Sequence, residues 1–538
     1  MKMGKFLEKL KGINWFVAII LALLIVVVSN LINNCSGRRE LAVGDHKWDK
    51  LLLILDEIEK NYVDTIDYKK FVESSIPAIM QNLDPHSTYL PPKELEDAEE
   101  SLEGNFSGIG VQFNVPNDTA IIINVIQGGP SEKVGILSGD RIMNVNGKRV
   151  GGVKFNQDSL VKLLKGPIGT YVEVGMRRPG VSELLQFKIK RDKIPLKSLD
   201  AAFMLKEGVG YIKLSKFSKT THAEFDKAAQ KLQKAGMKEL IFDLRDNTGG
   251  YLDQALLISN EFLPKGALVV YLKGVHRSRQ DFYADGTGKY KGTILYVLIN
   301  ENTASSSEIF TGAMQDNDRA LILGRRSYGK GLVQEPIYFS DKSGIRLTVA
   351  RYYTPTGRSI QKPYSEDYQY DLFERYKHGE MTVADSIKKD VKLKFKTPKG
   401  KVVYGGGGII PDVFVPLDTI GITNFLIECN KKSLQIKFSN NIADKYRVQL
   451  RTIKTLKQLD ALLSSMKLEA NFLAFAKENG VIAKIEDWKA SREIIITQLE
   501  GLVGRYTTFD DDAFYPYILK TDNLIHKTLE ILSLNRKK

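Results

Sequence analysis

The stretch Ile294-Leu-Tyr-Val-Leu-Ile-Asn-Glu-Asn-Thr-Ala-Ser-Ser-Ser-Glu308 decides how the centre of this chain folds. Its first six residues are continuously apolar, which is typical of a buried strand. The chain then turns at Asn300–Thr303, and from Ser306 the apolar residues recur at helical spacing. Ser305 is therefore predicted at a strand-to-helix turn, with its hydroxyl exposed beside the free N–H groups of a helix N-terminus. The alternative is that Ser305 or Ser306 only caps the helix.

A lysine that follows this serine changes the balance between the two interpretations. Lys330 lies in Ser327-Tyr-Gly-Lys-Gly-Leu-Val-Gln334, and no histidine is near it or Ser305. A lysine whose pKa is lowered by burial can act as the base of a serine nucleophile. Gln334 shares a strand face with Lys330 and is placed to orient its amine. Glu308 lies one helical turn beyond Ser305 and is expected to bind the lysine segment or the turn backbone. The alternative is an exposed loop lysine.

The lysine segment also fits the spacing of a phosphate-binding loop, because Gly324–Lys330 reads G-x-x-x-x-G-K. That motif needs Ser or Thr next and then a helix. Here Gly331 follows, and a strand-like run begins. Nucleotide binding is therefore disfavoured.

Strand-like and helix-like runs alternate over residues 195–360, which indicates a sheet with crossover helices. One strand ends in Asp243-Leu-Arg-Asp-Asn-Thr-Gly-Gly250. Its bare glycine N–H groups are placed to form half of an oxyanion hole, although a simple strand–helix turn is the alternative. We expect a helical domain at 45–100. A second domain is expected over 195–430, and it contains a polar inserted loop at 365–403.

Residues 103–192 switch to short strands and contain one helix-like run, Phe155–Lys165. Asn146-Gly147 is a hairpin-type turn within them. This order resembles a PDZ domain, with a generic β-rich domain as the alternative. The resemblance implies that the loop Gly108-Ile109-Gly110-Val111 captures a peptide carboxylate through backbone N–H groups.

The two ends of the chain differ in character. Residues 1–36 combine a lysine-rich start, Met1–Gly12, with an apolar run, Trp15–Val28. This pattern predicts an uncleaved single-pass anchor in the cytoplasmic membrane, with a cleaved signal peptide as the alternative. The positive-inside rule then places the rest of the chain in the periplasm or otherwise outside the cytoplasm. Residues 432–538 are predicted to be a helical docking or packing domain.

Composition argues against several other classes of function. The net charge of +14 is dispersed, so a basic surface is favoured over nucleic-acid binding, with attraction to anionic lipids as a second possibility. The two cysteines, Cys35 and Cys429, form no disulfide framework. The six histidines have no metal-ligand spacing, so neither a metal nor another cofactor is expected.

Taken together, six segments resemble the C-terminal processing (tail-specific) peptidase family of Ser/Lys serine proteases. They cover about 45–430 and comprise the PDZ-like segment together with Leu83-Asp-Pro-His-Ser-Thr-Tyr89, Asp243–Gly250, Asn302–Ile309, Tyr328–Gln334 and Gly408-Ile-Ile-Pro-Asp412. The resemblance implies an α/β peptidase core with a crotonase-like sheet and crossover helices, beside the PDZ domain and two helical regions.

The resemblance also assigns roles to residues. It implies Ser305 as nucleophile, Lys330 as base, Gln334 as the residue that orients the lysine, and backbone N–H groups of Ser306 and of Gly249 or Gly250 as the oxyanion hole. Ser306 stands where the family usually has alanine, which leaves the N–H unchanged. The expected partners are C-terminal tails of exported or unfolded proteins, with a homo-oligomer or an adaptor also possible. The rival hypothesis is a non-catalytic PDZ scaffold that binds C-termini.

Overall fold

The computed structural model describes residues 15–36, 46–126, 128–365 and 368–536, and divides into two compact units, Met1–Ser75 and Ile76–Lys538. The first unit contains α2 (Trp15–Ser36), α3 (Asp49–Asn61) and the start of α4 (Tyr68–Gln81). The lysine-rich Met1–Gly12 lies outside the described residues.

The predicted membrane anchor is wrong. Among the helices that the structure describes, none is long and apolar enough to cross a membrane. The apolar run Trp15–Val28 covers about 21 Å at about 1.5 Å per residue, short of a hydrocarbon core of about 30 Å. The remainder of α2 is rich in serine and asparagine. The predicted single-pass location in the membrane is therefore not supported.

A six-stranded sheet forms the centre of the second unit, in the order β10-β11-β12-β15-β16-β21. The strands after β10 run parallel, because crossover helices connect them, and β10 is antiparallel at one edge. Their bounds are β10 (Leu199–Lys206), β11 (Val209–Leu214), β12 (Glu239–Asp243), β15 (Ile294–Ile299), β16 (Ala320–Gly324) and β21 (Val413–Phe414).

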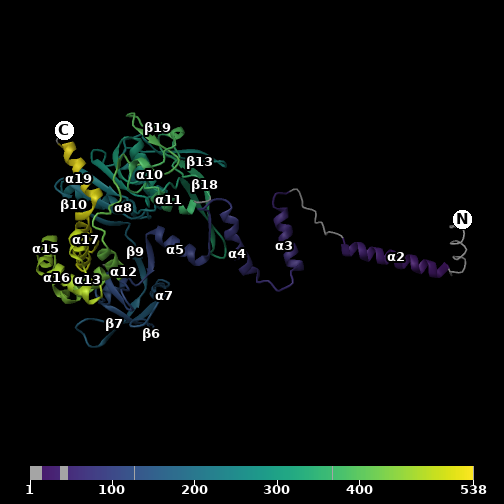
Figure 1. Ribbon diagram of the computed structural model, residues 1–538, viewed down its shortest axis with the longest axis horizontal. Helices are drawn as coiled ribbons and strands as arrows, with labels where there is room; N and C mark the ends of the chain where they lie inside the picture. Colours follow the sequence, from purple (N-terminus) through teal and green to yellow (C-terminus); the bar gives the residue numbers. More distant parts are fainter. Residues whose placement is uncertain (1–14, 37–45, 127, 366–367, 537–538) are drawn as a thin grey trace. The chain divides into compact units, whose positions relative to one another are not determined.

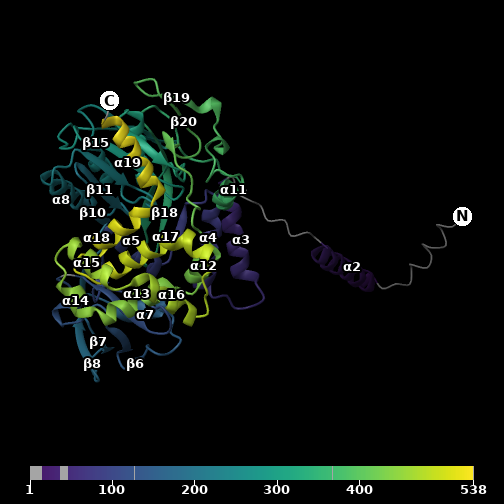
Figure 2. The same ribbon diagram turned by 60° about the vertical axis from the view of Figure 1, so that its left-hand side comes forward.

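Helices cover both faces of this sheet. Side chains of α8 (Thr221–Lys234), α9 (Leu252–Asn260) and α10 (Ser306–Asp316) share one apolar cluster with inward residues such as Phe242 and Val297. On the other face, α19 (Asn523–Arg536) contributes Leu524, Ile525 and Leu532 to a cluster with Tyr211, Ile241 and Tyr296. The last helix of the chain, yellow in Figures 1 and 2, thus packs on the central sheet.

A second, antiparallel sheet has the order β1-β18-β13-β14, and β17 also pairs with β18. Its bounds are β1 (Thr88–Leu90), β13 (Leu268–Gly274), β14 (Arg277–Tyr283), β17 (Leu332–Tyr338) and β18 (Gly344–Tyr353). Because β1 belongs to this sheet, the segment before it is brought beside the loop that carries Lys330. The 365–403 stretch adds η2 (Tyr368–Tyr370), α11 (Asp371–Lys377) and β19 (Lys394–Lys396), which pairs with β20 (Val402–Tyr404).

The PDZ-like segment is built on a sheet of order β3-β4-β5-β7-β8, with β6 paired to β5. β2 and β9 form a separate two-stranded ribbon at its entry and exit. The bounds are α5 (Pro92–Glu103), β2 (Asn105–Gly108), β3 (Val111–Asn114), β4 (Ala120–Val125), α6 (Pro130–Lys133), β5 (Arg141–Val145), β6 (Lys148–Arg149), α7 (Gln157–Leu164), β7 (Tyr171–Arg177), β8 (Leu184–Lys190) and β9 (Asp192–Pro195).

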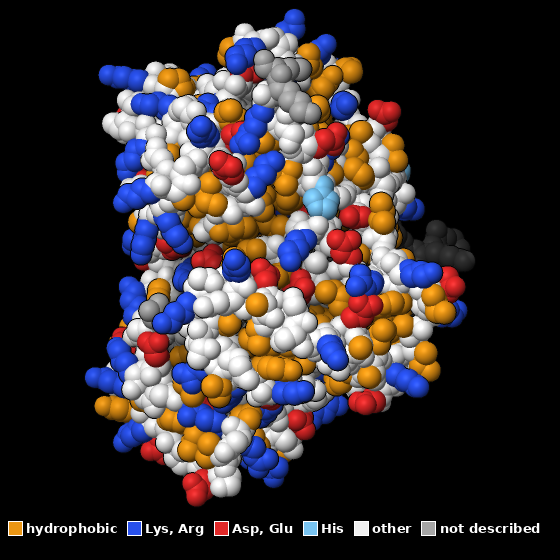
Figure 3. Space-filling view, turned by 90° about the vertical axis from the view of Figure 1, so that its left-hand side faces the viewer, with side chains coloured by type: hydrophobic (Ala, Val, Ile, Leu, Met, Phe, Trp, Pro, Cys, Tyr) orange, Lys and Arg blue, Asp and Glu red, His pale blue; other side chains and the backbone are white. Residues whose placement is uncertain are grey.

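A group of C-terminal helices lies between the PDZ strands and the central sheet (Figures 1 and 2). Arg141 of β5 pairs with Asp444, and Asn124 of β4 donates to Asp510 at 2.6 Å. The bounds are α12 (Asn424–Lys431), α13 (Leu434–Lys445), α14 (Arg447–Thr452), α15 (Leu456–Ser465), α16 (Leu468–Glu478), α17 (Ile485–Gly504) and α18 (Asp511–Ile518). On the face in Figure 3, lysine and arginine side chains are spread among acidic and apolar ones.

Candidate active site

Ser305 occupies the turn between β15 and α10. Its backbone has φ 56° and ψ −119°, a conformation that L-residues rarely adopt. Such strain persists only where surrounding contacts fix it, and it is concentrated at functional sites. The turn places the Ser305 side chain at the N-terminus of α10, where the first N–H groups have no partner within the helix.

Lys330 lies just before β17 and is largely buried. Its Nζ donates to Gln334 Oε1 at 2.8 Å, and Gln334 Nε2 donates to the His86 carbonyl at 2.5 Å. Burial lowers the pKa of Lys330, and nearby Arg346 lowers it further, whereas Glu308 and Asp84 oppose the shift. A glycine precedes the lysine because φ at Gly329 is 89° and an added Cβ would meet the backbone of Gly408 at 3.0 Å.

The buried carboxylate of Glu308 joins the serine turn to the lysine loop. It accepts hydrogen bonds from the N–H groups of Ser305 at 2.9 Å, Gly329 at 2.8 Å and Lys330 at 2.9 Å. It also accepts from Ser327 Oγ at 2.5 Å. Burial raises the pKa of Glu308, and these hydrogen bonds oppose that shift. The carboxylate therefore fixes the backbones of the two candidate catalytic residues relative to each other.

Tyr352 of β18 makes a second connection between the same two residues. Its fully buried hydroxyl lies 2.7 Å from the Lys330 carbonyl and 3.1 Å from the Ser305 carbonyl. Within the described residues, no hydrogen bond joins Ser305 Oγ to Lys330 Nζ. The structure thus holds the two backbones together without a direct side-chain bond, and catalytic hydrogen bonds often form only when substrate is bound.

The expected oxyanion donors are brought beside Ser305, but they are not equivalent. Gly249 N–H donates to Asn247 Oδ1 at 2.9 Å, so it is already occupied. In the part of the chain that the structure describes, the N–H groups of Ser306 and Gly250 donate to no protein acceptor. Ser306 Oγ donates to the Gly250 carbonyl at 2.7 Å, which ties the two segments together. Ser306 and Gly250 are therefore the available pair.

Gly249 has a packing role instead. Its φ is 97°, and an added Cβ would lie 2.7 Å from Ser305 Cβ and 2.9 Å from Ser306 N. The backbone can pass this close beneath the serine only because position 249 has no side chain.

The sequence did not assign a role to the segment Leu83–Tyr89, although it is one of the matching motifs. The His86 carbonyl holds Gln334, and His86 Nε2 lies 2.6 Å from the Tyr368 hydroxyl. Burial, together with the charge of Lys330, lowers the pKa of His86 to about 4, so the ring is neutral at neutral pH. Ser87 Oγ accepts from Thr348 N–H at 3.1 Å, which secures the segment on β18.

The other predicted features are located as follows. Gly108, Ile109, Gly110 and Val111 line a cavity between the PDZ sheet and α5. Lys330 is followed by strand β17, not by the helix that a phosphate-binding loop needs. Among the described residues, no three His, Cys, Asp or Glu side chains gather as a metal site would require.

Comparison with known proteins identifies the family. The model of peptidase family S41 matches residues 208–370, and that of the PDZ domain matches 107–190. A carboxy-terminal processing protease, CtpA of Bacillus subtilis, is 31% identical over 441 residues, which covers 78% of this chain and 93% of that protein. The chain belongs to peptidase family S41. This S41 peptidase is therefore a serine-type protease of the carboxy-terminal processing group.

Two further similarities were found. The carboxy-terminal-processing protease of Bartonella bacilliformis is 33% identical over 66% of this chain and 83% of its own length. A solved photosystem II D1 C-terminal processing protease is 27% identical and covers 69% of this S41 peptidase and 87% of that chain, with a TM-score of 0.36. The predicted fold class, a peptidase core with a PDZ domain and helical regions, is confirmed.

Proposed function

We propose that this chain is a Ser/Lys endopeptidase that cleaves proteins near C-terminal tails captured by its PDZ domain. The observation that carries the proposal is the partly buried Lys330, whose amine is oriented by Gln334 while Glu308 binds the N–H groups of Ser305 and Lys330. A lysine in this setting, with a lowered pKa, is suited to accept a proton.

The reaction follows from these positions. Neutral Lys330 accepts the hydroxyl proton of Ser305 while Oγ attacks the carbonyl carbon of the scissile peptide. The N–H groups of Ser306 and Gly250 receive the negative charge that develops on the carbonyl oxygen. The Lys330 ammonium then gives its proton to the departing amine as the C–N bond breaks, which leaves an acyl ester on Ser305.

The second half restores the enzyme. A water molecule loses a proton to Lys330 and attacks the ester carbon, and the same N–H groups receive the charge again. The C–O bond to Ser305 breaks, Oγ recovers a proton from Lys330, and the acid product leaves. Gln334 accepts a hydrogen bond from Nζ throughout, which directs the lysine lone pair toward the serine.

Tail capture is assigned to the groove that contains Gly108–Val111. An extended peptide would pair with β3, and its terminal carboxylate would meet the N–H groups of the loop. In the described residues, the N–H groups of Ile109 and Gly110 donate to no protein acceptor, which leaves them available for this role.

The test compares wild type with Ser305→Ala, Lys330→Ala and Lys227→Ala, the last a matched exposed lysine on α8. Each is incubated with peptides that carry an apolar tail, as free acid or as amide, and new C-termini are read by mass spectrometry. We expect cleavage of the free acid by wild type and Lys227→Ala only. Near-wild-type turnover by Lys330→Ala would refute the base. Tail binding without cleavage in wild type would favour the scaffold hypothesis.

A further inference from the structure

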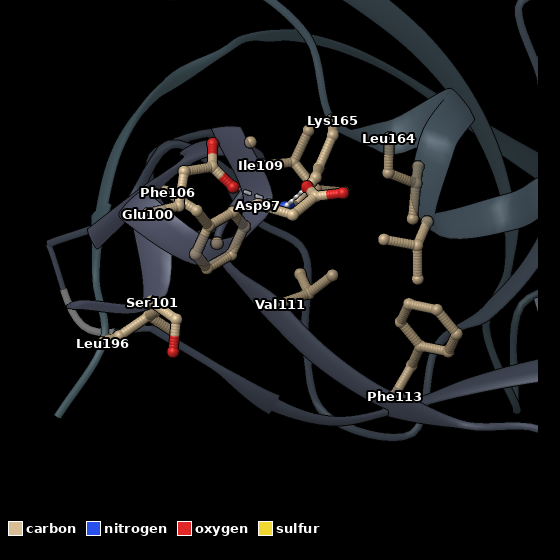
Figure 4. A pocket seen from close by; sticks show the side chains of 13 residues that line it. Asp97, Glu100, Ser101, Phe106, Ile109, Val111, Phe113, Leu164, Lys165 and Leu196 are labelled. Carbon is tan, nitrogen blue, oxygen red and sulfur yellow. Dashed lines mark hydrogen bonds and ion pairs between the residues drawn. The ribbon is translucent and has the colours of Figure 1, made fainter. Parts of the chain in front are cut away.

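The groove of the PDZ domain is closed on one side by a helix from outside that domain. A cavity of about 330 Å³ lies between the PDZ sheet and α5. Its apolar wall is formed by side chains of the β2–β3 region and of α7, namely Ile109, Val111, Phe113, Val161 and Leu164. Figure 4 shows Asp97 and Glu100 of α5 on the opposite side, with Lys165 between them.

Lys165, the residue after α7, is the cation of this groove and is already paired. Its Nζ lies 2.5 Å from Glu100 Oε2 and 3.3 Å from Asp97 Oδ1. The Lys165 side chain is 27% exposed and that of Glu100 is 20% exposed. Both charges are thus partly removed from water. Replacing Glu100 by another carboxylate as the partner of Lys165 therefore requires less free energy than leaving either charge without a partner.

Glu100 binds donors at the edge of the carboxylate loop. While Oε2 accepts from Lys165, its Oε1 accepts from the N–H of Ser107 at 3.3 Å. Ser107 directly precedes the loop Gly108–Val111. One side chain of α5 therefore binds both the groove's lysine and a backbone donor beside the carboxylate loop, as the end of a bound tail would.

We propose that Lys165 is the side chain that receives the terminal carboxylate of a substrate tail, and that Glu100 is an internal competitor for it. The proposal rests on the proposed capture of tails by this groove. Binding replaces the Lys165–Glu100 pair by a pair between Lys165 and the tail, with the N–H groups of Ile109 and Gly110 as further donors. The groove then selects an apolar last residue with a free carboxylate, and the negative charges of Asp97 and Glu100 disfavour acidic residues just before it.

The experiment measures binding alone, in the full chain with Ser305→Ala, so that no cleavage contributes. A fluorescent peptide that ends in Ala-Leu-Val is titrated as free acid and as amide, and anisotropy gives both affinities. Lys165→Met should weaken binding of the acid about tenfold, the value of one charge-assisted hydrogen bond, and leave the amide unchanged. Glu100→Gln should strengthen binding of the acid roughly two- to fivefold, because a partly exposed ion pair is worth about 0.2–1 kcal/mol.

Lys162→Met on α7 is the matched control, since it removes an exposed lysine that does not line the groove. The gain expected for Glu100→Gln cannot arise from misfolding, which keeps the proposal testable if Lys165→Met is unstable. If wild type binds the free acid more tightly than the amide, but both variants bind the free acid with the same affinity as wild type, the roles of Lys165 and Glu100 are refuted while tail capture stands. If wild type does not prefer the acid, tail capture fails and this proposal fails with it.

Discussion

Replacing Gln334 by glutamate puts a carboxylate where the amide oxygen now accepts from Lys330 Nζ. Two unit charges at that 2.8 Å separation interact by about 6 kcal/mol at an effective dielectric constant of about 20. Desolvation of the new carboxylate and solvent screening reduce this value. If one quarter remains, about 1.5 kcal/mol, the pKa of Lys330 rises by about one unit.

The sign of the effect follows from the proton that Lys330 must accept. Activity requires the neutral amine of Lys330. Activity is therefore present at pH values above the pKa of Lys330 and is lost as the pH falls through that pKa. Burial lowers that pKa in the wild type. The substitution Gln334→Glu raises it, so the acid limb of the profile should move upward by about one pH unit or more. At a fixed pH below the limb, kcat/KM should fall about tenfold or more.

The assay is kcat/KM for a fluorogenic tail peptide, measured from neutral to strongly alkaline pH. Gln334→Met removes the acceptor without adding charge and should lower activity with a smaller displacement of the limb. Gln280→Glu, on the exposed face of β14, adds the same charge away from the site and should leave the profile unchanged. A Gln334→Glu limb that superimposes on that of wild type would refute Lys330 as the titrating base.

Three further substitutions test other parts of the structure. Tyr352→Phe removes the hydroxyl that donates to the Lys330 carbonyl, whereas the Ser305 carbonyl keeps the N–H groups of Glu308 and Ile309, so urea denaturation should show a loss of about 1–3 kcal/mol; unchanged stability would contradict the described contacts. Gly249→Ala forces a Cβ against Ser305 and should lower kcat/KM roughly tenfold or more in a chain that circular dichroism shows to be folded. Burial raises the pKa of Asp510 to about 6, so its contribution to stability is present at acidic pH and is lost as the pH rises through about 6. Asp510→Asn should therefore raise the free energy of unfolding at neutral pH by about 2 kcal/mol and have little effect at acidic pH. A larger stabilisation at acidic pH than at neutral pH would disprove the raised pKa of Asp510.

Local sequence patterns predicted the parts of the site that depend on neighbours in the chain. The apolar run Ile294–Ile299 is β15, and α10 begins at Ser306, as the switch in periodicity indicated. Gln334 bonds to Lys330 as expected, although Lys330 precedes β17 and the register of β17 shifts between Val333 and Gln334, so simple strand alternation does not account for the contact. Glu308 binds both the lysine segment and the serine turn, the two alternatives that its position one turn beyond Ser305 left open.

Contacts between distant segments could not be predicted in this way. The bond from Gln334 to the His86 carbonyl depends on the pairing of β1 with β18, and strand pairing leaves no local signal in a three-residue strand. Sequence spacing likewise could not separate Gly249 from Gly250, because the difference lies in one hydrogen bond to Asn247. The apolar run near the N-terminus was misread because its continuous part is shorter than the span that a membrane needs.

The four hydrogen bonds accepted by Glu308 limit how far the site can come apart while they remain intact. Since one buried carboxylate fixes the backbones of both Ser305 and Lys330, the main chain of the nucleophile and that of the base cannot separate without breaking it. An inactive form that keeps these bonds would retain the assembled backbone and differ in the rotamer of Lys330, in the hydrogen bond from Gln334 to the His86 carbonyl, or in access of the substrate. Inhibitors that react with Ser305 would then require only a change of rotamer, not refolding of the site, to label the resting enzyme.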